Sequence, residues 1–490
     1  MEPILAPGRN CWRIEQCARA SVIIDAADYY RCIRQSMVVA QHRILIIGWD
    51  FDTRVLLEPT KRRETLGHFF LSLAKQNPAR RIDILKWSFG AKKQFLSPRA
   101  AWTLWRWART EAIEFHFDGA HPAGCSHHQK IVVLDDRLAV CGGIDIATAR
   151  WDTSRHADED PHRRLPNGKP YPPWHDATMM LAGPIAAVLG ELGSDRWFCA
   201  TSKKLEPVES PAREMWPADL AVQFENIAVG IARTRAQYND LSEVREIEAL
   251  YLDMISAAKR FVYIENQYFT SAKIAGAIAK RLEEPDPPEF VLVMPRTADG
   301  WLEQMAMDAA RTRLARQIAE CDHKNRFRIY VPVTQQGGDI YVHAKVAIVD
   351  DRLLRIGSSN LNNRSLGLDS ECDVIIDAAF EPNHGTPKAM ADLRTRLLSE
   401  HLDVTPDLFA TRFEQCESLI ETIEALRGNG KTLEALDLIT PGPLEQYIAD
   451  NELLDPEDAE GFLEPMSQRG LRKHWAQGLS WIRRRRKRGT

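Results

Sequence analysis

Several features are missing from this chain of 490 residues, and each absence excludes a class of protein. No run of about 18 consecutive apolar residues occurs, so a membrane-spanning helix is not expected. The first residues lack a basic stretch followed by an apolar one, which argues against a secretory signal. The nine cysteines include no Cys-x-x-Cys pair, which favours free thiols in a reducing compartment over a disulfide framework or a zinc knuckle.

Basic residues are outnumbered by acidic ones outside the last stretch of the chain, residues 471–490. That stretch holds eight Lys or Arg and no acid, so the rest carries 56 basic against 68 acidic side chains, a net charge of −12. An acidic body of this kind is a poor non-specific binder of nucleic acid. The run Arg483–Arg488 could attract an anionic lipid surface, but such runs are also commonly inert solvated tails, and both interpretations remain open.

The chain does contain an internal repeat, which decides its organisation better than its length does. Residues 126–137 (SHHQKIVVLDDR) align with residues 341–352 (YVHAKVAIVDDR) at a shift of 215, and the register continues without a gap to Asp145 and Asn360. Upstream, Arg43–Trp49 matches Arg260–Asn266 at a shift of 217. The repeat therefore predicts two strand-rich halves of similar order.

A helical pattern precedes each upstream strand, around Ala26–Ala40 and Val244–Ala258, which makes the repeated unit an α/β domain. We expect two duplicated domains with mixed sheets flanked by helices, related by a pseudo-two-fold axis and sharing one site at their interface. The predicted boundaries are 1–205, 206–400, and a helical extension with a basic tail over 401–490.

The most informative part of the repeat is His-x-Lys, present at His128 and Lys130 and again at His343 and Lys345. Side chains alternate along a strand, so each histidine is expected to share a face with its lysine. One such motif would suit an exposed strand edge, but two in a single unbroken register indicate a catalytic function. The acids that follow, Asp135 and Asp350, are an odd number of residues away and are expected to be structural turn residues.

This pattern resembles the phospholipase D superfamily, whose signature is His-x-Lys, four residues and then Asp, present twice. The resemblance covers residues 20–400 and extends to motifs typical of the eukaryotic-type enzymes. In the first half these are Gly142–Asp145, Arg150–Asp152 and Pro173–Asp176; in the second they are Tyr263–Phe269, Gly357–Asn360 and Asp369–Glu371. No appended lipid-binding domain of the eukaryotic kinds is recognised in the sequence.

The resemblance implies a two-step displacement at phosphorus. His128 is the favoured nucleophile, forming a phosphohistidine, and His343 is the general acid and base. Lys130 and Lys345 would hold the phosphoryl oxygens, and Asn360 would add a hydrogen bond.

A carboxylate downstream in each half is expected to orient the histidine of the same half: Asp176 for His128 and Glu371 for His343. Asp145 and Ser358 complete the expected substrate-binding set with Asn360. Because Asp145 occupies the position of Asn360, the two halves are expected to play unequal roles.

The resemblance thus implies a phospholipase D that hydrolyses glycerophospholipids such as phosphatidylcholine to phosphatidic acid and also transfers the phosphatidyl group. The alternatives are a cardiolipin-synthase-like phosphatidyl transferase, a nuclease of the same superfamily, and a non-catalytic membrane scaffold. No metal, cofactor or nucleic-acid partner is expected. The chain is expected to be a cytoplasmic monomer, with peripheral membrane attachment through Arg483–Arg488 as the open alternative.

Overall fold

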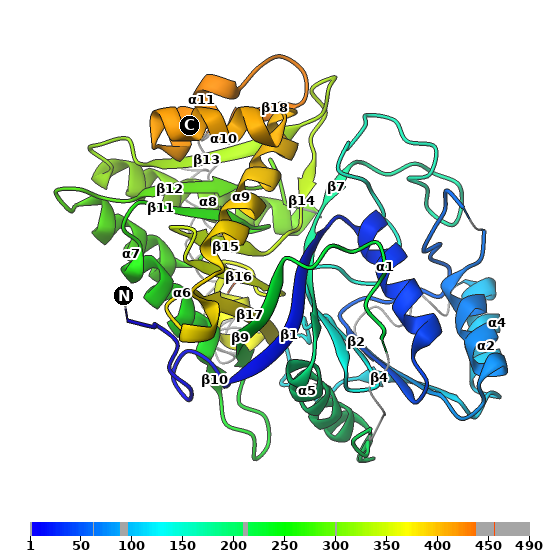
Figure 1. Cartoon of the computed structure of the whole chain (residues 1–490). Coiled ribbons are helices and arrows are strands. Elements are labelled where there is room, and N and C mark those ends of the chain that lie inside the picture. The colour runs from blue at the N-terminus through cyan, green and yellow to red at the C-terminus, as the bar shows by residue number, and fades with distance from the viewer. Residues whose placement is uncertain are drawn as a thin grey trace, which may run out of the picture.

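A computed structural model describes residues 2–61, 63–88, 97–208, 214–298, 301–437 and Asp455, with residues 301–306 described by their backbone only. Two lobes lie side by side, one formed by the first half of the chain and one by the second, and β1 and β9 lie between them (Figure 1). Across the described residues, no helix combines the length and the apolar character that a membrane crossing requires. All nine cysteines are described, and all are free thiols.

One sheet of 16 strands runs through both lobes in the order β18-β13-β12-β11-β15-β16-β17-β9-β1-β8-β6-β5-β2-β3-β4, with β10 paired to β9. Its strands are β1 (Arg13–Ile24), β2 (Arg43–Gly48), β3 (Arg81–Trp87), β4 (Ile113–Asp118), β5 (Ile131–Leu134), β6 (Leu138–Gly142), β8 (Ala177–Ala182), β9 (Phe224–Arg235), β10 (Val244–Arg245), β11 (Phe261–Glu265), β12 (Glu289–Val293), β13 (Phe327–Val333), β15 (Val346–Val349), β16 (Leu353–Gly357), β17 (Glu371–Asp377) and β18 (Thr432–Ala435). A separate parallel pair joins β7 (Trp174–His175) to β14 (Tyr341–Val342).

The sheet order shows the duplication directly. Counted outward from the β1–β9 pair at its centre, β8, β6, β5, β2, β3 and β4 on one side correspond to β17, β16, β15, β11, β12 and β13 on the other. The three outermost strands of each set pair in parallel, and the remaining pairs are antiparallel, so the sheet is mixed as expected. The halves are therefore joined by main-chain hydrogen bonds and not merely packed together.

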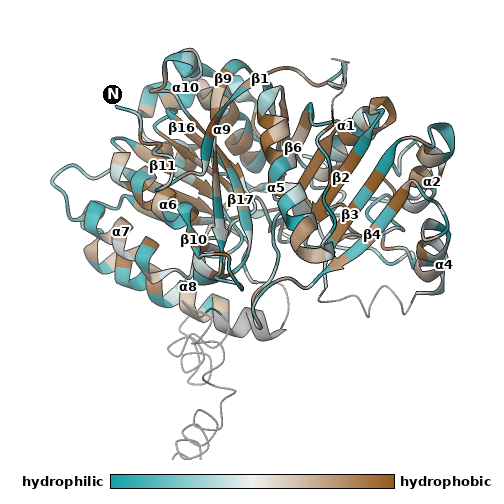
Figure 2. Ribbon diagram, turned by 90° about the horizontal axis from the view of Figure 1, so that it is seen from below, coloured by the Kyte–Doolittle hydropathy of each residue, from teal (hydrophilic) through white to brown (hydrophobic). Residues whose placement is uncertain are grey.

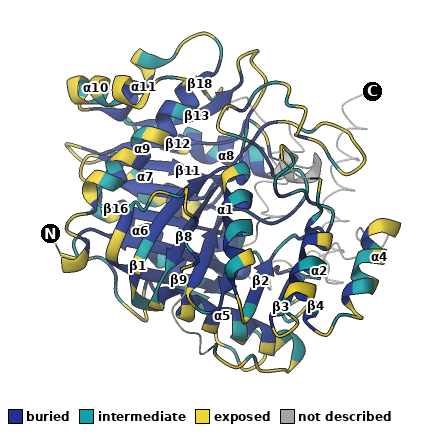
Figure 3. Ribbon diagram, turned by 45° about the vertical axis from the view of Figure 1, so that its right-hand side comes forward, coloured by how far each residue is buried: buried dark blue, intermediate teal, exposed yellow. Residues whose placement is uncertain are grey.

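Helices cover both faces of the sheet, and its strands are consequently buried on both sides and strongly apolar (Figures 2 and 3). The helices are α1 (Ala26–Val39), α2 (Leu66–Gln76), α4 (Pro98–Trp107), α5 (Pro184–Thr201), α6 (Glu246–Ala257), α7 (Ala272–Leu282), α8 (Trp301–Cys321), α9 (Pro387–Leu402), α10 (Pro406–Cys416) and α11 (Leu419–Leu426), with a π-helical turn η1 (Arg364–Leu368) and a 3₁₀ turn η2 (Glu381–Asn383). On one face a single core runs across both halves, beneath α5, α9, α10 and α11. On the other face each half has its own core, beneath α1, α2 and α4 or beneath α6 and α7.

The two turns that follow the His-x-Lys motifs have the same construction. Asp135 and Asp136 have φ values of 50° and 51°, and Asp350 and Asp351 have 54° and 51°, the left-handed pair that a tight two-residue hairpin requires. The Asp135 carboxylate accepts hydrogen bonds from the backbone N–H groups of residues 41–43, and Asp350 does the same for residues 259–261. Each acid thus fastens its hairpin to the start of the neighbouring strand.

The C-terminal region differs from its expected form. The boundary placed at residue 400 falls inside α9, and residues beyond it contribute a strand as well as helices, because β18 pairs with the sheet edge at β13. This region therefore extends the second half. The basic run Arg483–Arg488 lies outside the described residues.

Candidate active site

Both His-x-Lys motifs lie directly before a strand. His128 and Lys130 precede β5, and His343 and Lys345 precede β15, so the expectation that they sit within a strand is wrong. Each lysine bends back over its own motif: Lys130 Nζ donates to the carbonyl oxygen of His128 at 2.9 Å, and Lys345 Nζ donates to that of His343. The shared geometry places both ammonium groups beside the imidazoles.

Each histidine is paired with a carboxylate from the opposite half. His128 Nδ1 lies 3.0 and 3.1 Å from the two carboxylate oxygens of Glu371, and His343 Nδ1 lies 2.7 Å from Asp176 Oδ2. The expected assignment within each half, Asp176 to His128 and Glu371 to His343, is therefore wrong. In both pairs the carboxylate fixes Nδ1 as the protonated nitrogen and leaves Nε2 for chemistry.

Each histidine pairs with an acid from the opposite half because of the way the backbone segments of the two halves pair. β7, which ends next to Asp176, is parallel to β14, which ends next to His343, and His343 N–H donates to the carbonyl of His175 at 2.8 Å. In the mirrored position, His128 N–H donates to the carbonyl of Ser370, the residue before Glu371, at 2.9 Å. Each half thus delivers its acid to the other half's motif, and one composite site results.

Burial raises the pKa values of the two acids by different amounts. Burial raises the pKa of Glu371 to about 8, although hydrogen bonds from the hydroxyls of Ser358 at 2.5 Å and Ser365 at 2.7 Å act in the opposite direction. Burial raises the pKa of Asp176 less, to about 6, with Lys345 opposing it. The structure places Ser358, expected to contact substrate, as a partner of Glu371.

The two lysines have unequal surroundings. Lys130 Nζ makes a 3.2 Å ion pair with Asp145 Oδ2, and Asp145 Oδ1 accepts the backbone N–H groups of Trp49 and Asp50. Asp145 is therefore placed as a counter-ion to Lys130. Lys345 lies 3.4 Å from the side-chain oxygen of Gln267, and burial lowers its pKa to about 7.

Asn360, the counterpart of Asp145, is buried, and its side-chain oxygen has no hydrogen-bond partner among the described residues. Burial and the nearby lysines hold the pKa values of both His128 and His343 well below the ordinary value, and Arg150 adds to the effect on His343. Both imidazoles are neutral in the free protein near pH 7, and an anion bound beside the lysines would raise their pKa values.

A tryptophan borders each imidazole. The Trp49 ring centroid lies 5.9 Å from that of His128, and Trp174 lies 5.1 Å from His343, with the Arg150 guanidinium 4.1 Å from the Trp174 ring. Trp49 was not among the site residues predicted from the sequence. The signal that could have identified it was its position directly after β2, because the last residues of β2 pair with the start of β5, next to the first motif.

The neighbouring His127 belongs to a separate set of contacts. Its Nδ1 lies 2.7 Å from the Ser370 hydroxyl and its Nε2 lies 3.2 Å from Asp118, while burial and Arg196 lower its pKa to about 4. Across the described residues, none of the groupings suited to a metal ion includes His127 or His121.

A cavity of about 960 Å³ has residues 147–149 in its lining, and neither His128 nor His343 lines it. Four arginines line this cavity, with no acid among the lining residues: Arg54, Arg63, Arg99 and Arg164. Trp151, Tyr171 and residues 161–162 and 164–168, all from the segment between β6 and β7, form part of its wall.

Comparison with known proteins agrees with this geometry. A family model described as "Cardiolipin synthase, PLD-like domain" matches residues 251–393. Phospholipase D alpha 2 of Brassica oleracea var. capitata is 24% identical, with 86% of this chain and 70% of that protein aligned. Phospholipase D1 of Saccharomyces cerevisiae is 27% identical, with 67% of this chain and 25% of that protein aligned.

Among solved structures, the phosphatidylserine synthase of Haemophilus influenzae Rd KW20 superposes with a TM-score of 0.56 at 12% identity, covering 82% of this chain and 95% of that one, which shows a common fold. The duplicated sheet, the composite histidine–lysine centre and relatives that align over most of the chain lead to one assignment. This protein belongs to the phospholipase D superfamily.

Proposed function

We propose that this protein cleaves the phosphodiester of glycerophospholipids such as phosphatidylcholine, releasing phosphatidic acid and the free alcohol, and that it also transfers the phosphatidyl group to other alcohols. One observation carries the proposal: two buried imidazoles in one composite site, each with Nδ1 held by a carboxylate from the opposite half. Resemblance to lipid-cleaving relatives supports the choice of substrate class.

In the first step, Nε2 of His128 attacks phosphorus, the new N–P bond forms, and the bond from phosphorus to the alcohol oxygen breaks. Nε2 of His343, protonated once the anionic substrate is bound, gives its proton to the departing oxygen. Lys130 and Lys345 stabilise the negative charge that accumulates on the non-bridging oxygens.

In the second step, His343 is a free base and takes a proton from water or from another alcohol, whose oxygen attacks phosphorus. The N–P bond breaks and His128 is regenerated as a neutral imidazole. Phosphatidic acid forms with water, and a new phosphatidyl ester forms with an alcohol. Hydrolysis and transfer therefore share one intermediate.

The unequal carboxylates support this division of roles. Asp176 ionises more readily than Glu371, since their pKa values are raised to about 6 and about 8. An ionised carboxylate stabilises an imidazolium, which suits the general acid His343. Glu371, the less readily ionised of the two acids, accepts the Nδ1 proton of His128 and so leaves Nε2 of a neutral imidazole free as the nucleophile.

An exposed aromatic pair supports action at a lipid surface. Trp102 and Trp105, 57% and 47% exposed, stack at 4.7 Å on α4, with Arg109 3.6 Å above the Trp105 ring, and Trp102 lines the arginine-rich cavity. Tryptophan and arginine together suit the boundary between lipid headgroups and acyl chains.

The test compares wild type with His128→Ala and His343→Ala on phosphatidylcholine vesicles containing a primary alcohol. Wild type should yield phosphatidic acid and the phosphatidyl alcohol, and both variants should lose activity by several orders of magnitude because the two histidines act as a unit. Either variant matching wild type would falsify the proposal.

A second substrate separates the roles of the histidines. A p-nitrophenyl phosphodiester has a leaving group that needs no proton, so His343→Ala should still release one equivalent of nitrophenol and stall with phosphorus on His128. Mass spectrometry of the trapped protein locates the phosphohistidine. Phosphorus on His343 of the wild type would reverse the two assignments.

The description of the matching family model favours one alternative, phosphatidyl transfer to a lipid alcohol. Incubation with phosphatidylglycerol as both donor and acceptor distinguishes it: cardiolipin formed faster than phosphatidic acid would make the protein a synthase. A single-stranded oligonucleotide in the same assay tests the nuclease alternative, for which no cleavage is expected.

A further inference from the structure

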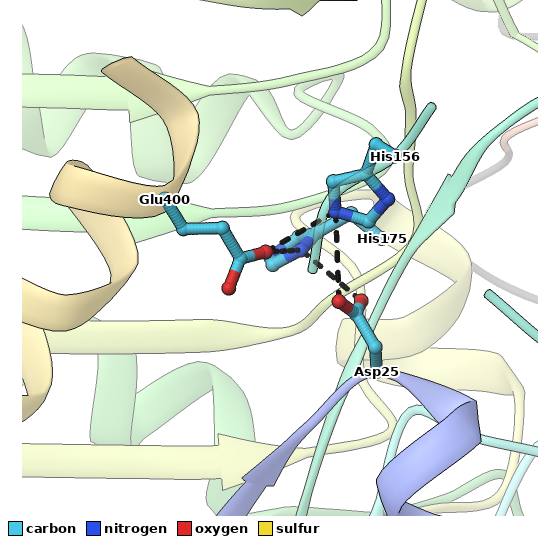
Figure 4. A group of neighbouring side chains, drawn as sticks. All are labelled: Asp25, His156, His175 and Glu400. Carbon is cyan, nitrogen blue, oxygen red and sulfur yellow. Dashed lines mark hydrogen bonds and ion pairs between the residues drawn. The ribbon is translucent and has the colours of Figure 1, made fainter. Parts of the chain in front are cut away.

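Beside the catalytic centre, four side chains from separate parts of the chain converge in the interior: Asp25, His156, His175 and Glu400 (Figure 4). Asp25 lies between β1 and α1, His156 lies in the loop after β6, His175 is in β7, and Glu400 is in α9. Asp25, both imidazoles and the Glu400 carboxyl are almost wholly shielded from solvent, with Glu400 the most exposed at 7%. The proposed reaction uses none of the four.

Four nitrogen–oxygen distances in this cluster are close to those of a tetrahedral ion site, with the two imidazoles facing different oxygens of Asp25, and one ligand atom from each residue lies within 4.8 Å of the others. His156 Nε2 lies 3.5 Å from Asp25 and 3.1 Å from Glu400, and His175 Nδ1 lies 3.3 and 3.2 Å from the same two carboxylates. Nitrogen and oxygen ligands at the usual zinc distances are about 3.3 Å apart in a tetrahedron.

In each imidazole, the ring nitrogen that faces away from Asp25 and Glu400 is hydrogen-bonded to another carboxylate. His156 Nδ1 lies 3.0 Å from Asp152, and His175 Nε2 lies 2.9 Å from Glu265. A metal-binding histidine is commonly held in this way, because the second carboxylate orients the ring and fixes its tautomer. The nitrogens left over, His156 Nε2 and His175 Nδ1, are the two that point between Asp25 and Glu400.

Two atoms at the centre are poorly satisfied by the protein itself. His175 Nδ1 and Asp25 Oδ2 are buried without a hydrogen-bond partner among the described residues, although each has an oppositely charged group within 3.5 Å. A buried polar atom without a hydrogen bond is costly, and coordination to a cation would satisfy both.

The local charge is also compatible with a cation, which would displace the protons that the carboxylates favour on the two imidazoles by raising the pKa values of His156 and His175. Carboxylates outnumber permanently charged bases here: Asp25, Asp152, Glu265 and Glu400 converge on the two imidazoles, and among the ion pairs of the described residues Arg163, held by Asp152, is the one arginine or lysine that contacts them. With neutral imidazoles, a divalent ion would offset most of the excess negative charge.

We propose that Asp25, His156, His175 and Glu400 bind one divalent transition-metal ion, and that Zn²⁺ fits this set of two imidazoles and two carboxylates. Because the protein fills all four tetrahedral positions, the ion is structural and does not take part in the reaction. Imidazole with carboxylate favours zinc over the harder Ca²⁺ and Mg²⁺.

Such an ion would fasten the two halves together beneath the catalytic centre. Three of its ligands come from the first half and Glu400 comes from the second. The backbone N–H of Asp25 donates to the carbonyl of Asp176, and the carbonyl of His175 accepts from the N–H of His343, both at 2.8 Å. The ion would therefore set the position of the Asp176–His343 pair without touching the substrate.

The test uses the full chain without a polyhistidine tag, stripped with a chelator and reconstituted with Zn²⁺. We expect about one tightly held ion per chain by elemental analysis and a higher thermal midpoint for the reconstituted protein. Reconstitution with Co²⁺ should give the strong visible absorption of a tetrahedral site. Retention of far less than one ion, with no change in thermal midpoint, overturns the proposal.

Variants locate the ion. Glu400→Gln preserves shape but is a poor ligand, and His156→Ala removes one imidazole; both should lose the bound ion, whereas the control His384→Ala, at an exposed position, should retain it. Retention of a full equivalent by both ligand variants would place the ion elsewhere. Should a variant not fold, the Co²⁺ spectrum of wild type decides: an octahedral spectrum rules out this ligand set.

Discussion

At the scale of single residues, burial lowers the pKa of a lysine side chain that the proposed mechanism requires in its charged form. The Lys345 ammonium, deep in the composite site, has its pKa lowered from 10.5 to about 7. A lysine whose pKa is depressed is charged below that value and neutral above it. Substrate binding through an ammonium is therefore sensitive to pH in the neutral range.

We accordingly expect kcat/KM to fall as the pH rises through about 7. In Lys345→Arg the guanidinium stays charged, so the alkaline decline should disappear, although overall activity should drop because arginine presents its charge differently. The measurement is kcat/KM against pH with phosphatidylcholine in mixed micelles. Lys203→Arg, at an exposed site, serves as the matched control. An unchanged alkaline decline in Lys345→Arg would assign it to another group.

The crossed pairs give a second prediction at this scale. Asp176→Asn should impair His343 and therefore proton transfer to the leaving group, by about 10²–10⁴-fold with phosphatidylcholine and much less with a p-nitrophenyl ester. Glu371→Gln should impair His128 and slow both substrates to a similar degree. If each acid served the histidine of its own half, the two patterns would be exchanged.

At the scale of elements, the Asp-Asp hairpins are the parts of the motif that do not act on substrate. Each first acid, Asp135 or Asp350, accepts three backbone N–H groups from the segment leading into the neighbouring strand. The repeat preserves these acids because each hairpin needs its anchor, which is a structural requirement.

Asp135→Ala and Asp350→Ala should each lower the free energy of unfolding by about 1–3 kcal/mol, because backbone donors lose their acceptor. Urea unfolding followed by tryptophan fluorescence measures the loss, with the exposed Asp240→Ala as the control. The folded variants should keep the wild-type kcat. A large loss of kcat with unchanged stability would instead give these acids a catalytic role.

The same elements show what the sequence could and could not reveal. Hydrophobic runs and the 215-residue register predicted the strands β5 and β15 and the turn after each, because those patterns are local, although the motifs lie just before these strands and not within them. Which half supplies each acid depends on β7 pairing with β14, a contact between segments more than 150 residues apart. Spacing along the chain favoured the wrong partner because it carries no information on such pairings.

The buried cluster was missed for a related reason. His156 lies in a charged loop and His175 next to a catalytic acid, so neither stood out, and Glu400 lies at the boundary assigned to the extension. The ligand-like arrangement exists only once α9 packs against the loop and β7.

At the scale of the whole molecule, the acidic body and the basic tail make opposite contributions to membrane binding. We expect the full chain to bind vesicles containing anionic lipid, and a chain ending at Gly470 to bind them several-fold less, with the difference vanishing at high salt. Sedimentation with phosphatidylserine vesicles measures this, and neutral vesicles are the control. Equal binding of both chains would show that the tail is inert and would leave Trp102 and Trp105 as the contact.

The pairing of each histidine with an acid of the opposite half also bears on how the duplicated chain evolved. A single half of this fold contains a histidine whose partner acid lies in the other half, and an acid whose partner histidine lies there too. It can therefore form a complete active site only by pairing with a second copy of itself. Fusion of two copies removes that dependence on concentration and frees the copies to diverge, as Asp145 and Asn360 have done at equivalent positions. A chain severed between the halves should accordingly yield two inert fragments that regain activity when they reassemble.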